Sequence, residues 1–245
     1  MRLDLFLFES GAVASRTEAK GFITKGGVIV NGKTVTKPSF EVSGEECIEV
    51  DKSSKKYVSR GGLKLEEALR CFEVKVAGRS ALDIGASSGG FTDCLLQNGA
   101  ARVIAVDSGV GQMAESLRAD PRVTVIENYN ARYMTASDFS FVPDLAVMDV
   151  SFISATYIIK PLADCLASGA DFICLIKPQF EVGKSGIGKG GIVKDERVRR
   201  TAIDKVTLFA ASCGFSLLGL IDSPIEGGDG NKEYLAHFKK ENTVE

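Results

Sequence analysis

The stretch ALDIGASSGGFT (residues 81–92) decides the fold, because an apolar run leads into a glycine-rich turn. Its first residues predict a buried strand, and a helical pattern follows at 91–97. Gly85, Gly89 and Gly90 allow the backbone between them to turn tightly and to approach a ligand closely. This order of strand, glycine turn and helix is typical of the ligand-binding edge of a doubly wound α/β sheet.

Acidic residues around the turn indicate the cofactor. Asp107 ends the next predicted strand, 22 residues past Gly85, where a carboxylate can bind ribose hydroxyls. The turn reads G-x-x-x-G-G, which differs from the dinucleotide fingerprint G-x-G-x-x-G, and Asp83 before it would face a cationic amino group and repel a pyrophosphate. These features favour S-adenosylmethionine, with NAD as the weaker alternative. The sequence has no GxxxxGK[ST], which excludes a P-loop.

The rest of the body alternates short apolar runs with helical periods, which predicts parallel strands covered by helices. Further strands are expected at 102–107, 123–128, 144–150, 171–177, 215–222 and 234–240. Further helices are expected from Leu63 onward and at 111–118, 153–168 and 194–213. The predicted fold class is a Rossmann-like α/β sheet with its ligand at the carboxyl ends of the strands. The predicted cofactor-binding residues are Asp83, Gly85, Ala86, Ser87, Gly89, Gly90, Phe91, Asp107, Asn130 and Asp149.

The composition is that of an ordinary globular chain. Its 245 residues are 44% hydrophobic and 25% charged, no run of 18 apolar residues occurs, and the start MRLDLFLFES lacks the pattern of a signal peptide. Six cysteines without a CxxC pair and a single histidine, His237, argue against a metal site and against Ser-His-Asp or Cys-His catalysis. We therefore expect a cytoplasmic protein with reduced thiols, no metal and no membrane partner.

Charge is distributed unevenly along the chain. Up to Lys64 there are 11 Lys and Arg against 8 Asp and Glu, a net charge of +3, and the remainder, with 19 against 24, carries −5. A basic segment on an acidic body suggests contact with a polyanion, and chance is the alternative. Residues 52–62 are polar, basic and glycine-ended. We predict domains at 1–58 and 63–245, joined by a linker at 59–62.

The N-terminal domain begins with helices and continues into a small sheet. Ser15 and Glu18 form a capping-box pattern, and Gly26-Gly27 predicts the end of the helix that follows. Asn31-Gly32 predicts a hairpin turn, and residues 47–51 predict another strand.

The motifs RLD, SRTEAK and GGVIVNGK in this domain resemble the RNA-binding domain of the ribosomal protein S-four type. In that family a helical pair and the following hairpin present a basic face to structured RNA. The resemblance implies RNA contacts by Arg2, Ser15, Arg16, Lys20, Lys25 and Asn31. For any single lysine, the alternative to an RNA contact is that the side chain simply lies on a solvent-exposed helix face.

Four polar residues stand where helices or strands of the body begin or end. Asp149 and Lys177 end two predicted strands, Glu233 precedes the last strand, and Lys64 opens the first helix. The carboxyl ends of the strands meet at one edge of a doubly wound sheet, so these side chains can share one cleft. Lysine is unusual there because an ammonium buried without partners is costly, and a surface ion pair of Lys177 is the alternative.

The motifs around these residues carry a second resemblance. RGGLKL, DIGASSGGFT, MDVSFIS, LIKPQFEVG, GKGGIV and GNKEY together resemble the TlyA-type family, known both as hemolysin A and as a ribosomal RNA 2′-O-methyltransferase. Its methyltransferase part is similar to the FtsJ-like enzymes, which implies a catalytic set of Lys64, Asp149, Lys177 and Glu233. The resemblance also implies S-adenosylmethionine as cofactor and ribosomal RNA or ribosomal subunits as partner.

The hypothesis for the reaction is in-line transfer of the cofactor's methyl group to a ribose 2′-oxygen. Lys177 is the expected base, Asp149 would hold its ammonium or the substrate, and Glu233 would orient the group. The glycine- and lysine-rich segment 180–194 either closes over RNA or forms a surface loop. Two rival functions stay open, a non-catalytic RNA-binding or ribosome-assembly protein and a membrane-active hemolysin.

Overall fold

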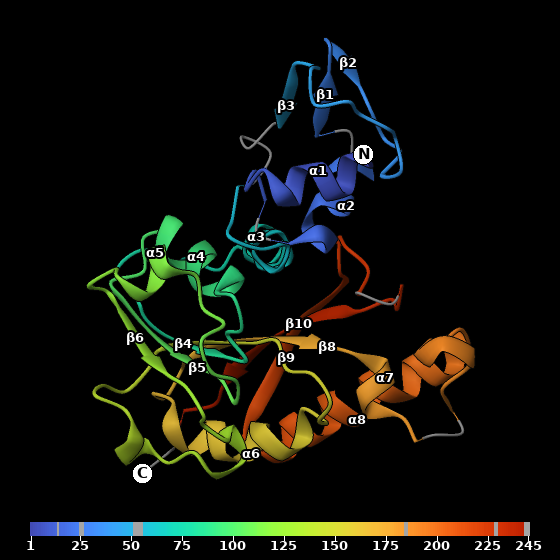
Figure 1. Cartoon of the computed structure of the whole chain (residues 1–245). Helices are drawn as coiled ribbons and strands as arrows, with labels where there is room; N and C mark the ends of the chain where they lie inside the picture. Colours follow the sequence, from blue (N-terminus) through green and yellow to red (C-terminus); the bar gives the residue numbers. More distant parts are fainter. Residues whose placement is uncertain (14, 25–26, 51–55, 184–185, 228–229, 243–245) are drawn as a thin grey trace. The chain divides into compact units, whose positions relative to one another are not determined.

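The computed structural model describes residues 1–13, 15–24, 27–50, 56–183, 186–227 and 230–242. The chain forms two compact units, Met1–Lys56 and Tyr57–Glu245. In Figure 1 the colour runs from blue in the first unit to red at the end of the second. Each unit has hydrophobic clusters of its own, so the fold of each follows from its own residues.

The first unit packs two helices against a three-stranded antiparallel sheet of order β2-β1-β3. Its elements are α1 (Leu3–Glu9), α2 (Arg16–Thr24), β1 (Val28–Val30), β2 (Lys33–Thr34) and β3 (Ile48–Val50). The side-chain oxygen of Ser15 accepts the backbone N–H of Glu18 at 3.1 Å, as an N-cap should. Asn31 and Gly32 have φ of 48° and 75°, so the predicted hairpin turn between β1 and β2 is confirmed.

The second unit is built on a seven-stranded sheet of order β6-β5-β4-β7-β8-β10-β9. Its strands are β4 (Ser80–Ile84), β5 (Arg102–Val106), β6 (Val123–Ile126), β7 (Leu145–Met148), β8 (Asp171–Ile176), β9 (Phe215–Asp222) and β10 (Tyr234–Lys240). The first five are parallel, and β10 runs antiparallel between β8 and β9. The chain leaves β4 toward β5 and later returns to place β7 on the other side. Ligands bind in the crevice at such a switch point, here between the ends of β4 and β7.

Helices cover both faces of this sheet (Figure 1). They are α3 (Gly61–Cys71), α4 (Gly90–Gln97), α5 (Glu115–Arg118), α6 (Thr156–Cys165), α7 (Pro178–Glu181) and α8 (Glu196–Ser212). Alternate strand residues point to opposite faces. Leu82 and Ile84 pack with α6 and α8, whereas Ala81 packs with α3 and α4. The predicted Rossmann-like α/β class is confirmed.

Two predicted helices are shorter in the structure. The one expected at 111–118 forms only at Glu115–Arg118, because Gly111 turns the chain with φ +67° just before it. The one expected at 153–168 is Thr156–Cys165, and the residues before it have a separate role described below.

The segment predicted as a linker belongs to the second unit. Tyr57 is 3% exposed and lies in the same hydrophobic cluster as Leu65 of α3. A Cβ on Gly62 would lie 2.3 Å from Cγ of Tyr57, so this tight contact requires glycine. Residues 59–62 are therefore packed, and α3 begins at Gly61 inside the predicted linker. Glycines often indicate a flexible segment, but here Gly62 allows Tyr57 to pack closely against α3.

Candidate active site

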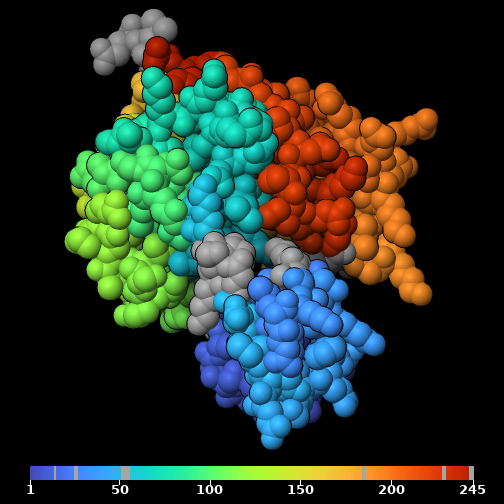
Figure 2. Space-filling model, turned by 90° about the horizontal axis from the view of Figure 1, so that it is seen from above, coloured from blue at the N-terminus to red at the C-terminus, as the bar shows by residue number. Residues whose placement is uncertain are grey.

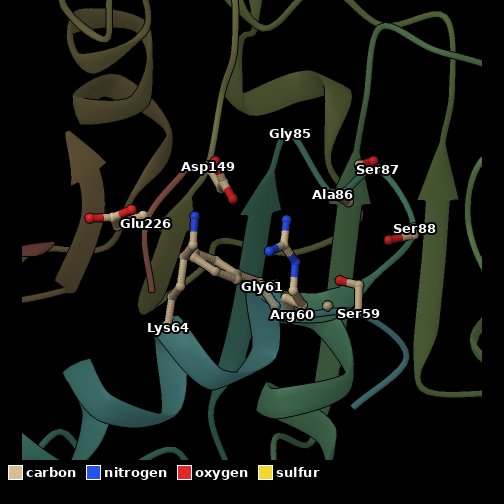
Figure 3. A pocket seen from close by; sticks show the side chains of 12 residues that line it. Ser59, Arg60, Gly61, Lys64, Gly85, Ala86, Ser87, Ser88, Asp149 and Glu226 are labelled. Atoms are coloured by element: carbon tan, nitrogen blue, oxygen red, sulfur yellow. The ribbon is translucent and has the colours of Figure 1, made fainter. Parts of the chain in front are cut away.

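A pocket of about 230 Å³ lies where β4 and β7 end. Figure 3 shows the side chains of Lys64 and Arg60 pointing into it from the start of α3, with Asp149 opposite. The residues that line it are Ser59, Arg60, Gly61, Lys64, Gly85, Ala86, Ser87, Ser88, Gly90, Phe91, Asp149 and Glu226. The pocket therefore occupies the edge of the sheet that the glycine turn predicted.

The glycine turn brings the ends of β4 and β7 together. Gly85 has φ +81°, and a Cβ there would lie 2.3 Å from the backbone oxygen of Asp149. Gly89 has φ +94°, and a Cβ there would lie 2.2 Å from Cδ1 of Leu117. Because both positions combine a left-handed backbone with no room for a side chain, only glycine fits them.

The start of α4 makes an equally close approach to the segment before α3. A Cβ on Gly90 would lie 2.2 Å from Oγ of Ser59 and 3.0 Å from the backbone nitrogen of Gly62. This contact places Ser59 and Arg60 on the wall of the pocket. Sequence reasoning missed both residues because it treated their segment as a linker. The glycines at 61 and 62 could have indicated that this segment packs closely against the rest of the unit.

Asp107 follows β5 and is fixed beside the turn by backbone donors. Its Oδ2 accepts the N–H of Ser87 at 2.8 Å and its Oδ1 accepts the N–H of Gly109 at 2.7 Å. Each carboxylate oxygen can accept further hydrogen bonds. Asp107 is only partly buried, so it can still receive the ribose hydroxyls of a bound nucleoside.

Asp83 lies beneath the turn and is fully buried. The hydroxyl of Thr92 donates to its Oδ2 at 2.6 Å, and its Oδ1 has no hydrogen-bond partner among the residues that the structure describes. Burial, with the charges of Asp149 and Asp107, raises the pKa of Asp83 to about 7, although the Thr92 hydrogen bond opposes this shift. Asp83 therefore carries an unused acceptor directly under the turn.

The four predicted catalytic side chains form two ion pairs. Nζ of Lys64 donates to Oε2 of Glu233 at 2.5 Å, and both side chains are buried. The ammonium of Lys177 contacts Oδ1 of Asp149 and donates to Oγ of Ser151 at 2.9 Å. The pocket joins the pairs, because Lys64 and Asp149 both line it.

The pair of Lys64 and Glu233 joins parts of the chain that are distant in sequence. Lys64 comes from the first turn of α3, and Glu233 immediately precedes β10. The teal residues of α3 and the red residues before β10 lie side by side on the surface of the second unit (Figure 2).

Several predicted residues do not line the pocket. Asp83 lies beneath it, and Gly89 and Asp107 shape and support the turn. Asn130 is exposed and caps the short turn that follows β6, where its Oδ1 accepts the N–H of Arg132 at 3.2 Å. Three further lining residues, Gly61, Ser88 and Glu226, were not predicted.

A second, wider pocket of about 630 Å³ opens at the loops that follow β7 and β8. Phe152 has φ +63° and is 92% exposed, and its ring centroid lies 5.1 Å from that of Phe180. The guanidinium carbon of Arg132 lies 4.6 Å from the centre of the Tyr157 ring. The pocket thus combines exposed aromatic faces with the cations Arg132 and Lys205. No single motif indicated it, because its residues come from the turn after β6, the loop after β7 and the helices α6, α7 and α8.

The floor of this second pocket is a buried carboxylate. Glu181 accepts the hydroxyl of Ser154 at 2.5 Å, the N–H of Ala155 at 2.7 Å and the ammonium of Lys205 at 3.0 Å. These bonds join α7, the start of α6 and α8. They explain why residues 153–155, which were predicted to be helical, stay outside α6.

In the first unit, most of the predicted RNA-binding residues also have structural partners. Arg2 and Arg16 both bind the buried carboxylate of Asp4. Oδ1 of Asn31 accepts the N–H of Cys47 at 2.9 Å and ties the hairpin to β3. Lys20 is exposed on α2, and Ser15 caps that helix. Lys25 lies outside the described residues.

Three other observations concern sites that the sequence argued against. Among the described residues, no helix is long and apolar enough to cross a membrane. No group of three or more His, Cys, Asp or Glu in the same residues is placed to hold a metal ion. His237 is buried in β10 with Nε2 at 2.9 Å from Oδ1 of Asp171, so it belongs to a structural cluster at the opposite edge of the sheet.

Comparison with known proteins assigns both units. Residues 57–240 match the model of the FtsJ-like methyltransferase family, and residues 1–47 match the S4 domain. The 16S/23S rRNA (cytidine-2′-O)-methyltransferase TlyA of Mycobacterium tuberculosis is 44% identical over 96% of this chain and 88% of its own length. Hemolysin A of Brachyspira hyodysenteriae is 42% identical over 97% of this chain and 99% of its own length.

Solved structures agree with these matches. A candidate hemolysin from Streptococcus thermophilus superposes with a TM-score of 0.80 at 43% identity and covers 99% of this chain and 89% of its own. An S-adenosylmethionine-dependent methyltransferase from Mesorhizobium loti, at 15% identity, shares the fold of the second unit with a TM-score of 0.55. The predicted enzyme class, a methyltransferase that uses S-adenosylmethionine, is confirmed. The chain belongs to the FtsJ-like methyltransferase family, among the TlyA and hemolysin A proteins, and carries an S4 domain at its N-terminal end.

Proposed function

We propose that this protein transfers the methyl group of S-adenosylmethionine to a ribose 2′-hydroxyl of ribosomal RNA. The observation that carries the proposal is that two ion pairs, Lys64 with Glu233 and Asp149 with Lys177, each place one member in the lining of the glycine-turn pocket. A hydroxyl is a weak nucleophile at neutral pH, so its methylation needs a base and a group that holds the base. These two ion pairs supply such groups beside a site suited to a nucleoside.

The residues of the turn fit the cofactor by their chemistry. Asp107 would bind the ribose hydroxyls, and the unused Oδ1 of Asp83 is an acceptor suited to the cationic amino end. Gly85 and Gly90 let the turn pack closely against Asp149 and Ser59, which shapes the pocket beside them. When bound, the cofactor supplies a methyl group on a positively charged sulfur.

In the proposed step, Lys177 first releases a proton of its ammonium to solvent and then takes the proton of the 2′-hydroxyl, and Asp149 stabilises the ammonium that results. The cofactor, held by Asp107 and Asp83, would supply the methyl group that the 2′-oxygen accepts as it loses its proton. Lys64, held by Glu233, would face the reacting oxygen from the other side of the pocket. The protein's main task is to hold the two reacting atoms about 3–3.5 Å apart in line.

Lys177→Ala tests the assignment of the base. We expect methyl transfer to ribosomal RNA to fall by about 10²-fold or more, while cofactor affinity is retained. Lys160→Ala, which removes an exposed lysine of α6, is the matched control and should keep full activity. Transfer at the normal rate by Lys177→Ala would remove Lys177 as the base.

The wider pocket supports RNA as the substrate. Bases of single-stranded or flipped-out nucleotides stack on aromatic side chains and arginine planes, which the loop around Phe152 and the Arg132–Tyr157 pair offer. Phe152 follows the catalytic Asp149 by three residues, so a base held there belongs to a nucleotide near the reacting ribose. Phe152→Ala should raise the KM for RNA and leave the KM for the cofactor unchanged.

Mapping of 2′-O-methyl groups in ribosomal RNA tests the substrate directly. RNA from cells with and without the gene should differ at one or more ribose positions, and the purified protein should restore them in vitro. A non-catalytic RNA-binding protein would produce no such difference. Leakage of liposomes caused by the purified protein would instead favour a membrane-active role.

A further inference from the structure

A buried carboxylate in the first unit holds two arginines side by side. Arg2 donates from Nε to Oδ1 of Asp4 at 2.9 Å and from Nη2 to Oδ2 at 3.2 Å. Arg16 donates from Nε to the same Oδ2 at 3.0 Å. The side chain of Asp4 is 0% exposed, whereas those of Arg2 and Arg16 are 44% and 46% exposed. The two guanidinium groups therefore meet at one oxygen and still face solvent.

Most donors of the two arginines are unused. A guanidinium has five N–H groups. In the described residues, Arg2 uses two of them and Arg16 uses one. Two guanidinium charges against one carboxylate leave the group with a net positive charge and several N–H donors for which the described residues provide no acceptor. A phosphate oxygen is the acceptor for which such paired donors are best suited.

Stability alone does not account for this arrangement. The contact between α1 and α2 is already made by apolar side chains, among them Leu3, Leu7, Ala19 and Ile23, which are almost completely buried. Burying a charge is costly, and an apolar residue in place of a buried ion pair is often as stable or more stable. Without Asp4, the two arginines would repel one another and each would sample many rotamers. The carboxylate therefore fixes the positions of the two arginines, although the packing of α1 against α2 does not require it.

We infer that Asp4 is a positioning residue that orders Arg2 and Arg16 to bind one backbone phosphate of RNA. The inference rests on the proposed RNA-binding function of the first unit. Pre-ordering removes the cost of arranging two flexible side chains at the moment of binding. Asp4 itself contributes no contact to the RNA, because its carboxylate is buried and would repel a phosphate.

The variant Asp4→Asn separates positioning from net charge, because the two effects have opposite signs. Removal of a negative charge near a phosphate site should strengthen RNA binding if only the potential matters. Loss of the positioning carboxylate should weaken it, and we expect the Kd for deproteinised ribosomal RNA to rise about tenfold. Filter binding by the full-length chain over a range of salt concentrations measures the Kd and the number of phosphates contacted.

A double-mutant cycle keeps the test valid if the unit is destabilised. Arg2→Gln and Arg16→Gln together should weaken binding, and Asp4→Asn in that double background should weaken it little further, because both positioned groups are already absent. Ile23→Val, a small core truncation in α2, is the control for stability and should leave the Kd unchanged at a similar loss of Tm. If Asp4→Asn does not fold, non-additive losses in Arg2→Gln and Arg16→Gln report the shared phosphate.

The outcomes distinguish the inference from the proposed function. Tighter RNA binding by Asp4→Asn, with weaker binding by Arg16→Gln, overturns the positioning role and leaves RNA binding intact. Unchanged binding by both Arg2→Gln and Arg16→Gln overturns RNA contact by this surface, and with it the inference.

Discussion

Single residues at the glycine turn decide whether the pocket can form. Gly85 combines a left-handed backbone with a distance of 2.3 Å from its would-be Cβ to the backbone oxygen of Asp149. Gly111 has a similar φ of +67° but has open space around it. The two glycines thus separate the effect of backbone conformation from the effect of steric exclusion.

We expect Gly85→Ala to lower the free energy of unfolding by clearly more than Gly111→Ala. The second substitution should cost about 1 kcal/mol, because only the left-handed conformation is penalised. Gly85→Ala must also displace the end of β7, so it should weaken cofactor binding. Urea denaturation and calorimetric titration measure both effects. Equal losses of stability would show that the turn tolerates a side chain at position 85.

Asp83 predicts a pH dependence of stability. Burial raises its pKa to about 7 from an ordinary value of 3.8, so the folded state keeps a proton that the unfolded state releases above about pH 4. The folded state therefore loses stability as pH rises from about 4 to 7, by up to about 4 kcal/mol, and the loss is constant above that range.

Asp83→Asn removes this titration. The variant should gain stability relative to the parent as pH rises through that window, which urea denaturation at pH 5, 6, 7 and 8 can follow. Asp222→Asn, which alters an exposed carboxylate at the end of β9, is the control. A constant difference between parent and Asp83→Asn across this range would contradict the assignment.

At the scale of elements, α3 and β10 are joined by a buried ion pair. Lys64 and Glu233 lie 169 residues apart, and the structure brings Nζ and Oε2 to 2.5 Å. Removal of one member leaves a buried charge unpaired, whereas removal of both does not.

Lys64→Met and Glu233→Leu should each destabilise the protein by about 3–5 kcal/mol. The double variant should lose less than the sum of the two, because no unpaired charge remains. Thermal unfolding of the parent and the three variants completes the cycle. Additive losses would show that the two side chains do not interact in solution. Methyl transfer should be lost in all three.

For the whole molecule, the two compact units predict two separable affinities. Every residue of the cofactor pocket belongs to Tyr57–Glu245, and the arginines around Asp4 belong to Met1–Lys56. Deletion of residues 1–56 should therefore weaken binding of ribosomal RNA about tenfold or more and change the Kd for S-adenosylmethionine by less than about twofold.

Calorimetric titration with the cofactor and filter binding with ribosomal RNA measure the two affinities of the deletion variant. Arg16→Gln in the full-length chain is the companion variant, because it alters the RNA surface without removing the unit. A large loss of cofactor affinity in Arg16→Gln would contradict the separation of functions.

The sequence predicted most of the sheet and much of the pocket, because both depend on local patterns. The apolar runs marked every strand of the second unit, and the spacing of Gly85, Gly89 and Gly90 located the ligand edge. The wrong prediction of a linker at 59–62 arose because glycine can indicate either a flexible segment or a close contact. At the start of α3 glycine marks close packing of Gly62 on Tyr57, which a sequence pattern cannot distinguish from flexibility.

By itself the sequence determined the class of fold, the glycine turn at which we propose that the cofactor binds and the residue types of the proposed catalytic set. Only the tertiary structure decided which partners meet: Lys64 with Glu233, Lys177 with Asp149 and Ser151, and both arginines with Asp4. Periodicity along the chain records which face of an element is buried. An ion pair depends on where elements distant in the chain end relative to one another, and that is set by the packing of the whole unit.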